Sequence, residues 1–198
     1  TYPVSYVEYH NKGLRPSAED YPDAYAAHHW NHSWIEPEAA IEPFVPKMEY
    51  IQIPFFRDRV EGHGTFLDLG AYRGDVSEHI LETTDHTVHA FDIIKYPEMD
   101  ILKSKWGNRF HFHNFGISGI TGEVPKFGDG EGATTIQTNK PHTGNAKVVK
   151  LSEWLSDNSE RVEGELTVKM DVEGSEFGII DDMVNSGAID KVDTWFID

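Results

Sequence analysis

The sequence predicts an α/β fold with a mostly parallel, twisted sheet that carries helices on both faces. Short apolar runs alternate with helix-like segments, which favours parallel strands joined by right-handed crossovers. One such run, T-F-L-D-L at 65–69, leads directly into a turn punctuated by glycines. The next apolar run ends on an acidic residue, Asp92. A glycine turn after one strand and an acid after the next are typical of a Rossmann-like sheet.

The individual elements follow from the same alternation. We expect strands at 65–69, 88–91, 109–115, 166–170 and 192–197, and helical segments at 76–82, 97–106, from 152 onward and at 176–184. Asp75 and Ser77 are candidate caps for the helix at 76–82. A short β-like run lies at 148–151. Residues 119–147 are glycine-rich and polar, so we expect a loop or an irregular hairpin there.

The length of 198 residues suits one α/β domain with a short appendage. Residues 1–47 are rich in Tyr, Trp, His and Pro and lack the pattern of a core element. We therefore expect an appendage or linker at 1–47 and the domain at 48–198. The sequence stops on the apolar run 194–198, which suggests that the natural protein is longer.

Composition excludes several classes of partner and site. There are 17 basic and 34 acidic residues, and the net charge of -17 argues against nucleic acid and anionic membranes as partners. The absence of cysteine excludes disulfides, a thiolate nucleophile and a zinc-thiolate site. No apolar run approaches the length of about 20 residues that spans a bilayer, and the amino terminus lacks a signal pattern. We expect a soluble, cytoplasmic protein.

The turn that follows 65–69 predicts a site for a nucleoside cofactor. Gly70 and Gly74 are spaced four apart and do not form the G-x-G-x-x-G pattern of a dinucleotide site. Tyr72 stands where a phosphate cradle leaves no room for a side chain. This favours S-adenosylmethionine, with Asp68 or Asp75 facing its ammonium group and backbone N–H groups facing its carboxylate. The alternative is an ordinary strand-turn-helix that needs glycine only for geometry.

The second strand ends on Asp92, whose carboxylate could accept hydrogen bonds from both ribose hydroxyls. Its distance from the glycine turn, about 20 residues, matches that of the ribose-binding acid in Rossmann-like sites. A solvated strand end is the alternative.

The run V-K-M-D-V-E-G-S-E at 168–176 delivers Asp171 and Glu173 to the same edge of the sheet. In an extended chain alternate residues share one direction, so both acids could face one pocket. They could bind a divalent cation such as Mg or Mn, or one could act as a general base toward a hydroxyl; the alternative is that they only cap turns. Glu176 is better placed to support the next helix, and the buried Lys169 needs a carboxylate partner or a path to the sheet edge.

Five strings, in order, resemble the FkbM family of S-adenosylmethionine-dependent methyltransferases: F-L-D-L-G-A-Y-R-G-D, V-H-A-F-D, N-F-G-I-S, V-K-L-S-E-W-L and V-K-M-D-V-E-G-S-E. The resemblance covers about residues 62–198. It implies the seven-stranded class I methyltransferase fold, here without the final antiparallel strands. It also implies S-adenosyl-L-methionine as cofactor and a sugar hydroxyl of a glycan or glycoconjugate as the methyl acceptor.

The resemblance also implies roles for individual residues. Asp171 and Glu173 would stand beside the transferred methyl group, and Asp92 would hold the ribose with Ile93 next to it. Tyr72 departs from the family, which usually has Asn there, so one hydrogen bond to the cofactor is in doubt. The methionine end would be lined by Gly70, Ala71, Tyr72 and Gly74, and the adenine flanked by Asn114, Gly116 and Ile117.

A shorter stretch at 25–34, Y-A-A-H-H-W-N-H-S-W, resembles the closing segment of some sugar transferases that act on nucleotide sugars. It implies fusion to glycosyltransferase domains, in a multidomain glycan-synthesising protein such as those of large algal viruses. The location would then be the host cytoplasm.

Two other functions compete with methyl transfer. A nicotinamide-dependent oxidoreductase is disfavoured by the missing middle glycine and by the absence of an obvious Tyr-x-x-x-Lys pair. A non-catalytic domain that binds a glycan or a partner is suggested by Tyr72 and by the early end of the sequence.

Overall fold

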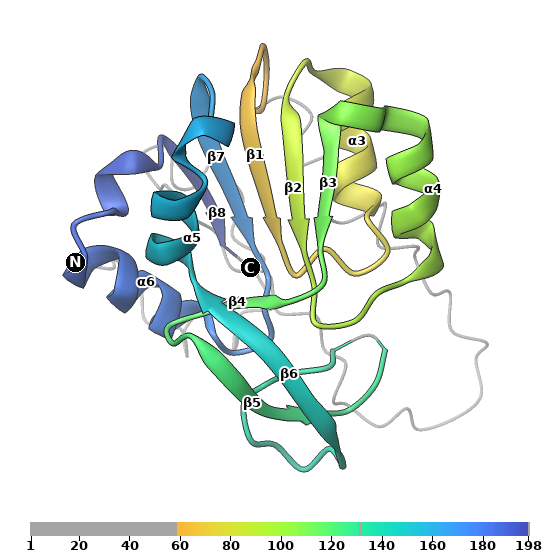
Figure 1. The fold of residues 1–198 in the computed structure, drawn as a ribbon, viewed down its shortest axis with the longest axis vertical. Helices are drawn as coiled ribbons and strands as arrows, with labels where there is room; N and C mark the ends of the chain where they lie inside the picture. Colours follow the sequence, from red (N-terminus) through yellow and green to blue (C-terminus); the bar gives the residue numbers. More distant parts are fainter. Residues whose placement is uncertain (1–58, 131, 198) are drawn as a thin grey trace, which may run out of the picture.

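The computed structural model describes residues 59–130 and 132–197; the predicted appendage at 1–47 and the first residues of the predicted domain lie outside these ranges. The described part is built on a five-stranded sheet of order β3-β2-β1-β7-β8 (Figure 1). Every pair of neighbours is parallel, as the sequence predicted. The strands are β1 (Gly64–Leu69), β2 (Thr87–Phe91), β3 (Phe110–His113), β7 (Glu165–Met170) and β8 (Thr194–Ile197).

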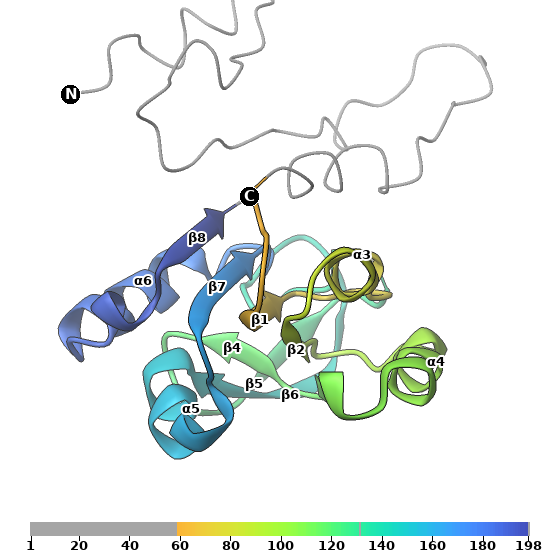
Figure 2. The ribbon, with the colours of Figure 1, turned by 90° about the horizontal axis from the view of Figure 1, so that it is seen from above.

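Helices cover both faces of this sheet, again as predicted (Figure 2). Alternate residues of β1 supply the two faces, because successive side chains of a strand point in opposite directions. Phe66 packs in one core with Ile80 of α3, whereas Leu67 packs in the other with Trp154 of α5 and Ile179 of α6. The α-helices are α3 (Asp75–Thr83), α4 (Pro97–Trp106), α5 (Leu151–Asp157) and α6 (Glu176–Asn185), and 3-10 turns lie at Gly107–Arg109, Ser159–Arg161 and Ile189–Lys191.

A small second sheet of order β4-β6-β5 lies below the carboxyl ends of the parallel strands in Figure 1. Its strands are β4 (Gly116–Ser118), β5 (Gly122–Phe127) and β6 (His142–Lys150). Strands β5 and β6 pair antiparallel with a register shift between Lys126 and Phe127, which confirms the irregular hairpin expected within 119–147. The short run expected at 148–151 is wrong in extent: β6 begins at His142, and Leu151 already belongs to α5.

Two local expectations need correction. The third strand ends at His113, not at 115, because the chain turns there and the N–H of Phe115 donates to the carbonyl of His113 at 2.9 Å. Helix α3 has Gly74 as its N-cap residue, with φ 87°, and no side chain caps it. Ser77 is buried and its Oγ donates instead to Asp68 Oδ2 at 2.7 Å.

None of the helices in the described ranges is long and apolar enough to cross a membrane.

Candidate functional site

The strand order reverses between β1 and β7, because β2 and β3 lie on one side of β1 and β7 and β8 on the other. In open α/β sheets, ligands bind outside the carboxyl ends of the strands at such a switch point. The segments that follow β1, β2 and β7 all leave the sheet at this edge (Figure 1). The residues that the sequence singled out on these three segments therefore share one end of the molecule.

Backbone hydrogen bonds attach the β1 loop to the end of β2. The N–H groups of Gly70 and Ala71 both donate to the carbonyl of Phe91 at 3.0 Å, and the N–H of Gly74 donates to the carbonyl of Ala71 at 2.8 Å. The N–H of Tyr72 donates to Asp92 Oδ2 at 2.8 Å. These four donors are engaged inside the protein, so the expectation that backbone N–H groups face a ligand carboxylate is wrong for Gly70, Ala71, Tyr72 and Gly74.

Glycine is required in this loop by the packing of the protein itself. Gly70 has φ 76°, and a Cβ there would lie 1.7 Å from the carbonyl oxygen of Asp171 at the end of β7. Gly74 has φ 87°, and a Cβ there would lie 2.5 Å from Leu102 Cδ1. Both positions demand a residue without a side chain. The geometric alternative therefore accounts for the two glycines, and they are not by themselves evidence of a cofactor.

Two residues of the edge have unusual backbone conformations. Tyr72, with φ 49°, and Glu173, with φ 56°, are the non-glycine residues of the described ranges that have positive φ. Such conformations cost about 1–3 kcal/mol each and concentrate at functional sites. The ring of Tyr72 lies edge-on to that of Tyr96, with centroids 4.9 Å apart, and beneath the Arg73 guanidinium. The strain therefore falls on the two loops that the sequence assigned to the site.

The carboxylate of Asp92, just after β2, is held by two backbone hydrogen bonds. Its Oδ2 accepts the N–H of Tyr72 and its Oδ1 accepts the N–H of Ile94, both at 2.8 Å. The side chain is partly exposed, and an ionised carboxylate has about four acceptor positions, so it can accept further hydrogen bonds. Burial raises the pKa of Asp92, and the two backbone hydrogen bonds and the charge of Lys169 oppose that shift.

The residues expected around an adenine are brought together in part. The side-chain amide of Asn114 donates to the carbonyl of Asp92 at 3.2 Å. A Cβ on Gly116 would lie 2.8 Å from Ile93 Cγ2, so these two residues are also in contact. Ile117 is different: it is buried in the core with Phe91 and cannot face a ligand at the surface.

Beneath the β1 loop lies a buried charge network. Asp68 is completely buried; its Oδ2 accepts from Ser77 Oγ at 2.7 Å, and its Oδ1 lies 3.2 Å from Lys169 Nζ. The ammonium of Lys169 also donates to the carbonyl of Gly70 at 2.8 Å. This confirms that Lys169 pairs with a carboxylate. Asp68 is thus engaged below the loop, whereas Asp75 is exposed at the start of α3.

The turn after β7 holds Asp171 and Glu173 by different contacts. The N–H of Asp171 donates to the carbonyl of Leu69 at 3.0 Å, and its Oδ2 lies 3.8 Å from Lys169 Nζ. Glu173 is exposed, and its carbonyl accepts from Thr134 Oγ1 at 2.7 Å.

Oε1 of Glu176 accepts the N–H groups of Val172 at 3.0 Å and Gly174 at 3.2 Å. Glu176 therefore supports the turn into α6, as the sequence predicted.

The described residues contain no group of three or more His, Asp or Glu side chains that could hold a metal ion. Asp171 has the ammonium of Lys169 beside it at 3.8 Å, and a cation is a poor neighbour for a divalent metal. The expected Mg or Mn site at Asp171 and Glu173 therefore lacks a fitting ligand set among the described residues.

Two clefts were not foreseen from the sequence. One, of about 650 Å³, lies between α6 and the small sheet and includes Gly174 and Ser175 of the β7 turn. The other, of about 400 Å³, is lined by Thr87, His89, Asn108, His111, Arg161 and Glu163. Both are assembled from segments distant in sequence, so no local pattern could have indicated them.

Comparison with protein families finds no match, and neither does comparison with curated proteins. Two solved structures are similar to parts of the chain. The first is a 1,6-didemethyltoxoflavin-N1-methyltransferase of Burkholderia thailandensis with bound 1,6-didemethyltoxoflavin and S-adenosylhomocysteine. The match is 36% identical, covers 31% of this chain and 27% of that chain, and has a TM-score of 0.27. The second is the methyltransferase FkbM of Methylobacillus flagellatus, 15% identical over 68% of this chain and 32% of that chain, with a TM-score of 0.44. The matched region thus spans under a third of either structure.

Proposed function

We propose that this chain is an S-adenosylmethionine-dependent methyltransferase that transfers a methyl group to a hydroxyl oxygen of a sugar. The observation that carries the proposal is that three loops meet at the switch point of the sheet. The Tyr72 N–H bound to Asp92 at 2.8 Å joins the loops after β1 and β2. Lys169, which donates to the Gly70 carbonyl at 2.8 Å and lies 3.8 Å from Asp171, joins the loops after β1 and β7.

This arrangement suits a nucleoside ligand with a tail. The carboxylate of Asp92 accepts hydrogen bonds from the ribose hydroxyls. The base is flanked by Ile93, Asn114 and Gly116. The tail then follows the β1 loop past Tyr72 toward the turn that carries Asp171. Asp75, which is exposed at the start of α3, is the carboxylate that we place beside the ammonium group of the tail. Asp68 acts indirectly, because it holds Lys169 against the Gly70 carbonyl.

When bound, S-adenosylmethionine supplies a methyl group on a sulfonium. As the carbon–sulfur bond breaks, a bond forms to the acceptor oxygen, which leaves S-adenosylhomocysteine and a methyl ether. Asp171 accepts the hydroxyl proton, because a sugar hydroxyl is a weak acid and benefits from a base. Its carboxylate lies 3.8 Å from Lys169 Nζ, and its backbone is fixed by the hydrogen bond from its N–H to the carbonyl of Leu69. Fixed placement of the base and acceptor supplies much of the rate.

Calorimetry with S-adenosylmethionine, S-adenosylhomocysteine and NAD tests the cofactor. We expect both sulfur nucleosides to bind and NAD not to bind. Transfer of labelled methyl groups to a panel of methyl glycosides then tests the reaction. Binding of NAD alone would instead support an oxidoreductase, and binding of the sulfur nucleosides without transfer to any glycoside would remove the sugar acceptor from the proposal.

A further inference from the structure

The larger cleft lies between α6 and the segments that join the two sheets. Its walls come from the chain after β4, the end of β6 and α6, and Gly174 and Ser175 also line it. These two residues follow Glu173 directly, so the cleft adjoins the turn that carries Asp171. Its volume of about 650 Å³ falls within the range typical of small-molecule sites, about 300–1,000 Å³.

A close backbone approach sets the position of the small sheet against α6. A Cβ on Gly119 would lie 2.5 Å from the carbonyl oxygen of Gly178, and a Cβ on Gly178 would lie 3.5 Å from Gly119 Cα. Two glycines therefore let the loop after β4 rest directly on the helix. This contact lies within the cleft and holds its walls at a fixed distance from each other.

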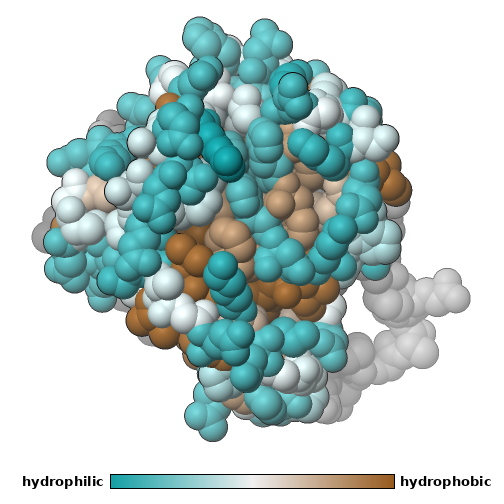
Figure 3. Space-filling view, viewed as in Figure 1, coloured by the Kyte–Doolittle hydropathy of each residue, from teal (hydrophilic) through white to brown (hydrophobic). Residues whose placement is uncertain are grey.

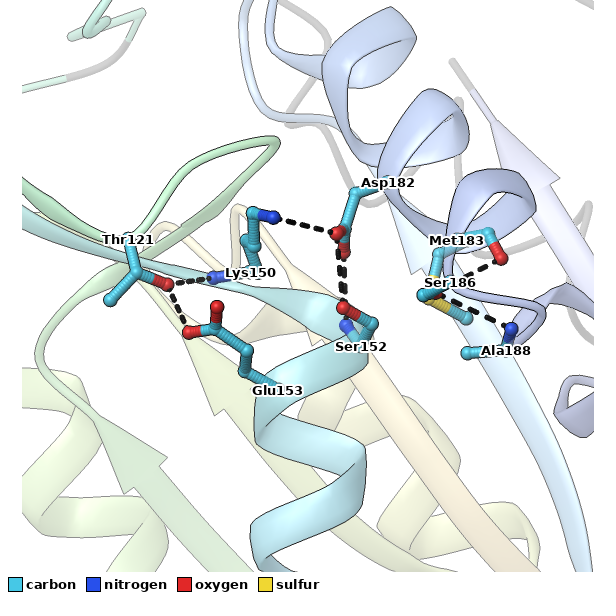
Figure 4. Close-up of polar contacts among 8 residues, drawn as sticks. All are labelled: Thr121, Lys150, Ser152, Glu153, Asp182, Met183, Ser186 and Ala188. Carbon is cyan, nitrogen blue, oxygen red and sulfur yellow. Dashed lines mark hydrogen bonds and ion pairs between the residues drawn. The ribbon is translucent and has the colours of Figure 1, made fainter.

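The floor of the cleft is a satisfied polar network (Figure 4). Asp182 is almost fully buried; it accepts the N–H of Ser152 at 3.1 Å and the hydroxyl of Ser152 at 3.0 Å, and it lies 3.4 Å from Lys150 Nζ. The N–H of Lys150 donates to Thr121 Oγ1 at 3.0 Å, which ties the loop after β4 to the end of β6. A network of this kind makes the floor rigid.

Two polar side chains on the wall are not used by this network. Asp181 and Asn185, four residues apart on α6, line the cleft and are exposed, and their side chains make no hydrogen bond to other described residues. Ile120 and Ile136, which are 54% and 45% exposed, add apolar surface to the same cleft. Figure 3 shows a hydrophobic area around β4, framed by hydrophilic surface.

We infer that this cleft binds the sugar acceptor, with Asp181 and Asn185 hydrogen-bonded to its hydroxyls and Ile120 and Ile136 against its C–H face; the inference rests on the proposed methyl transfer. A carboxylate and a carboxamide together accept from and donate to neighbouring hydroxyls. The net charge of -17 and the free carboxylate of Asp181 favour a neutral sugar over a phosphorylated one.

The test uses methyl glycosides of hexose, 6-deoxyhexose and pentose sugars as probes. Saturation-transfer NMR measures their binding, and labelled S-adenosylmethionine measures kcat and KM for the best glycoside. The variants are Asp181→Asn and Asn185→Ala. The matched control is Asp190→Asn, because Asp190 is an exposed acid just beyond α6 that does not line the cleft.

Each cleft variant should raise KM for the glycoside by up to about tenfold, the loss expected for one hydrogen bond. The variants should leave kcat and the Kd for S-adenosylhomocysteine unchanged, and Asp190→Asn should change nothing. Unchanged KM in both cleft variants overturns the inference, and so does the absence of glycoside binding to a wild-type protein that binds S-adenosylhomocysteine.

The two proposals fail in different ways. Without binding of S-adenosylhomocysteine, the proposed function is wrong. The NMR experiment still tests the cleft in that case, because glycoside signals that are lost in the cleft variants and kept in Asp190→Asn would support a sugar site independent of methyl transfer.

Discussion

Lys169 Nζ lies 3.2 Å from Asp68 Oδ1, and both side chains are almost completely buried between neighbouring strands of the sheet. The same ammonium donates to the carbonyl of Gly70 and lies 3.8 Å from Asp171. One buried pair therefore links the two strands on either side of the switch point and sets the position of both loops that leave them.

Removing the cation should destabilise the protein strongly. Lys169→Met leaves Asp68 buried without its partner, a change that typically costs about 3–5 kcal/mol in the free energy of unfolding. Urea denaturation measures this loss. The double variant Asp68→Asn, Lys169→Met carries no unpaired charge and should recover much of it. If the single variant loses less than about 1 kcal/mol, the pair does not hold the switch point together.

Substitution of Asp92 should weaken cofactor binding. Asp92→Asn removes the charged acceptor expected for the ribose, and hydrogen bonds to charged groups contribute about 1.5–3 kcal/mol. We therefore expect the Kd for S-adenosylhomocysteine to rise by roughly 10–100-fold in calorimetry. Asp100→Asn is the control, because Asp100 is an exposed acid on α4 that pairs only with Lys95 in the described structure. Equal affinities in the Asp92 variant and the wild type would exclude Asp92 from the site.

The affinity should also depend on pH through the same residue. Burial raises the pKa of Asp92, and in the proposed site its ionised form accepts hydrogen bonds from both ribose hydroxyls. Affinity should therefore fall as the pH drops through this raised pKa, and Asp92→Asn should lack that fall. An identical pH profile in the variant would show that another group is responsible.

Asp171→Asn should separate binding from turnover. The amide keeps the size of the side chain but cannot accept the hydroxyl proton, and loss of a general base typically costs about 10²–10⁴-fold in rate. We expect kcat to fall by this amount, while the Kd for S-adenosylhomocysteine changes little. Glu173→Gln is the comparison, because Glu173 is exposed beside the same turn. An undiminished kcat in Asp171→Asn would remove this residue from the mechanism.

Acid should destabilise the protein through a cluster of histidines on β2 and β3. His89 is buried, its Nδ1 lies 3.0 Å from His113 Nε2, and its ring stacks on that of His111. Burial, and next the neighbouring histidines, lower the pKa of His89 to about 3. Burial similarly lowers the pKa of His113 to about 4. Below the ordinary histidine pKa, these two side chains are therefore protonated in the unfolded chain but still neutral in the native state.

The sign follows from this difference in bound protons. The contribution of the two neutral histidines to the free energy of unfolding is fully present above about pH 6.5, the histidine pKa in the unfolded chain. It is lost as the pH falls toward 4. Each of these histidines contributes a slope of up to about 1.4 kcal/mol per pH unit. Urea denaturation between pH 7 and pH 4.5 measures the slope, which should become shallower in His89→Phe and stay unchanged in the control His142→Phe, since His142 is exposed on β6. A wild-type slope in His89→Phe would contradict the prediction.

The sequence alone determined the parallel sheet and the edge at which Asp92 and Asp171 stand. Both depend on local signals: an apolar run forms a strand, and an acid or glycine ends it. The expectation that Lys169 needs a carboxylate was equally local, because a buried ammonium is costly wherever it occurs. These predictions needed no knowledge of which strand lies beside which.

Only the tertiary structure decided which polar groups were already satisfied. The N–H groups of Gly70 and Ala71 donate to the carbonyl of Phe91. The hydroxyl of Ser77 donates to Asp68 and does not cap the helix. The cleft along α6 depends on Gly119 lying against Gly178, 59 residues later in the chain. A hydrogen bond or close approach between distant segments leaves no periodic trace in either one. The amino-acid sequence therefore indicates where chemistry can occur, and the tertiary packing determines which polar atoms are not already hydrogen-bonded.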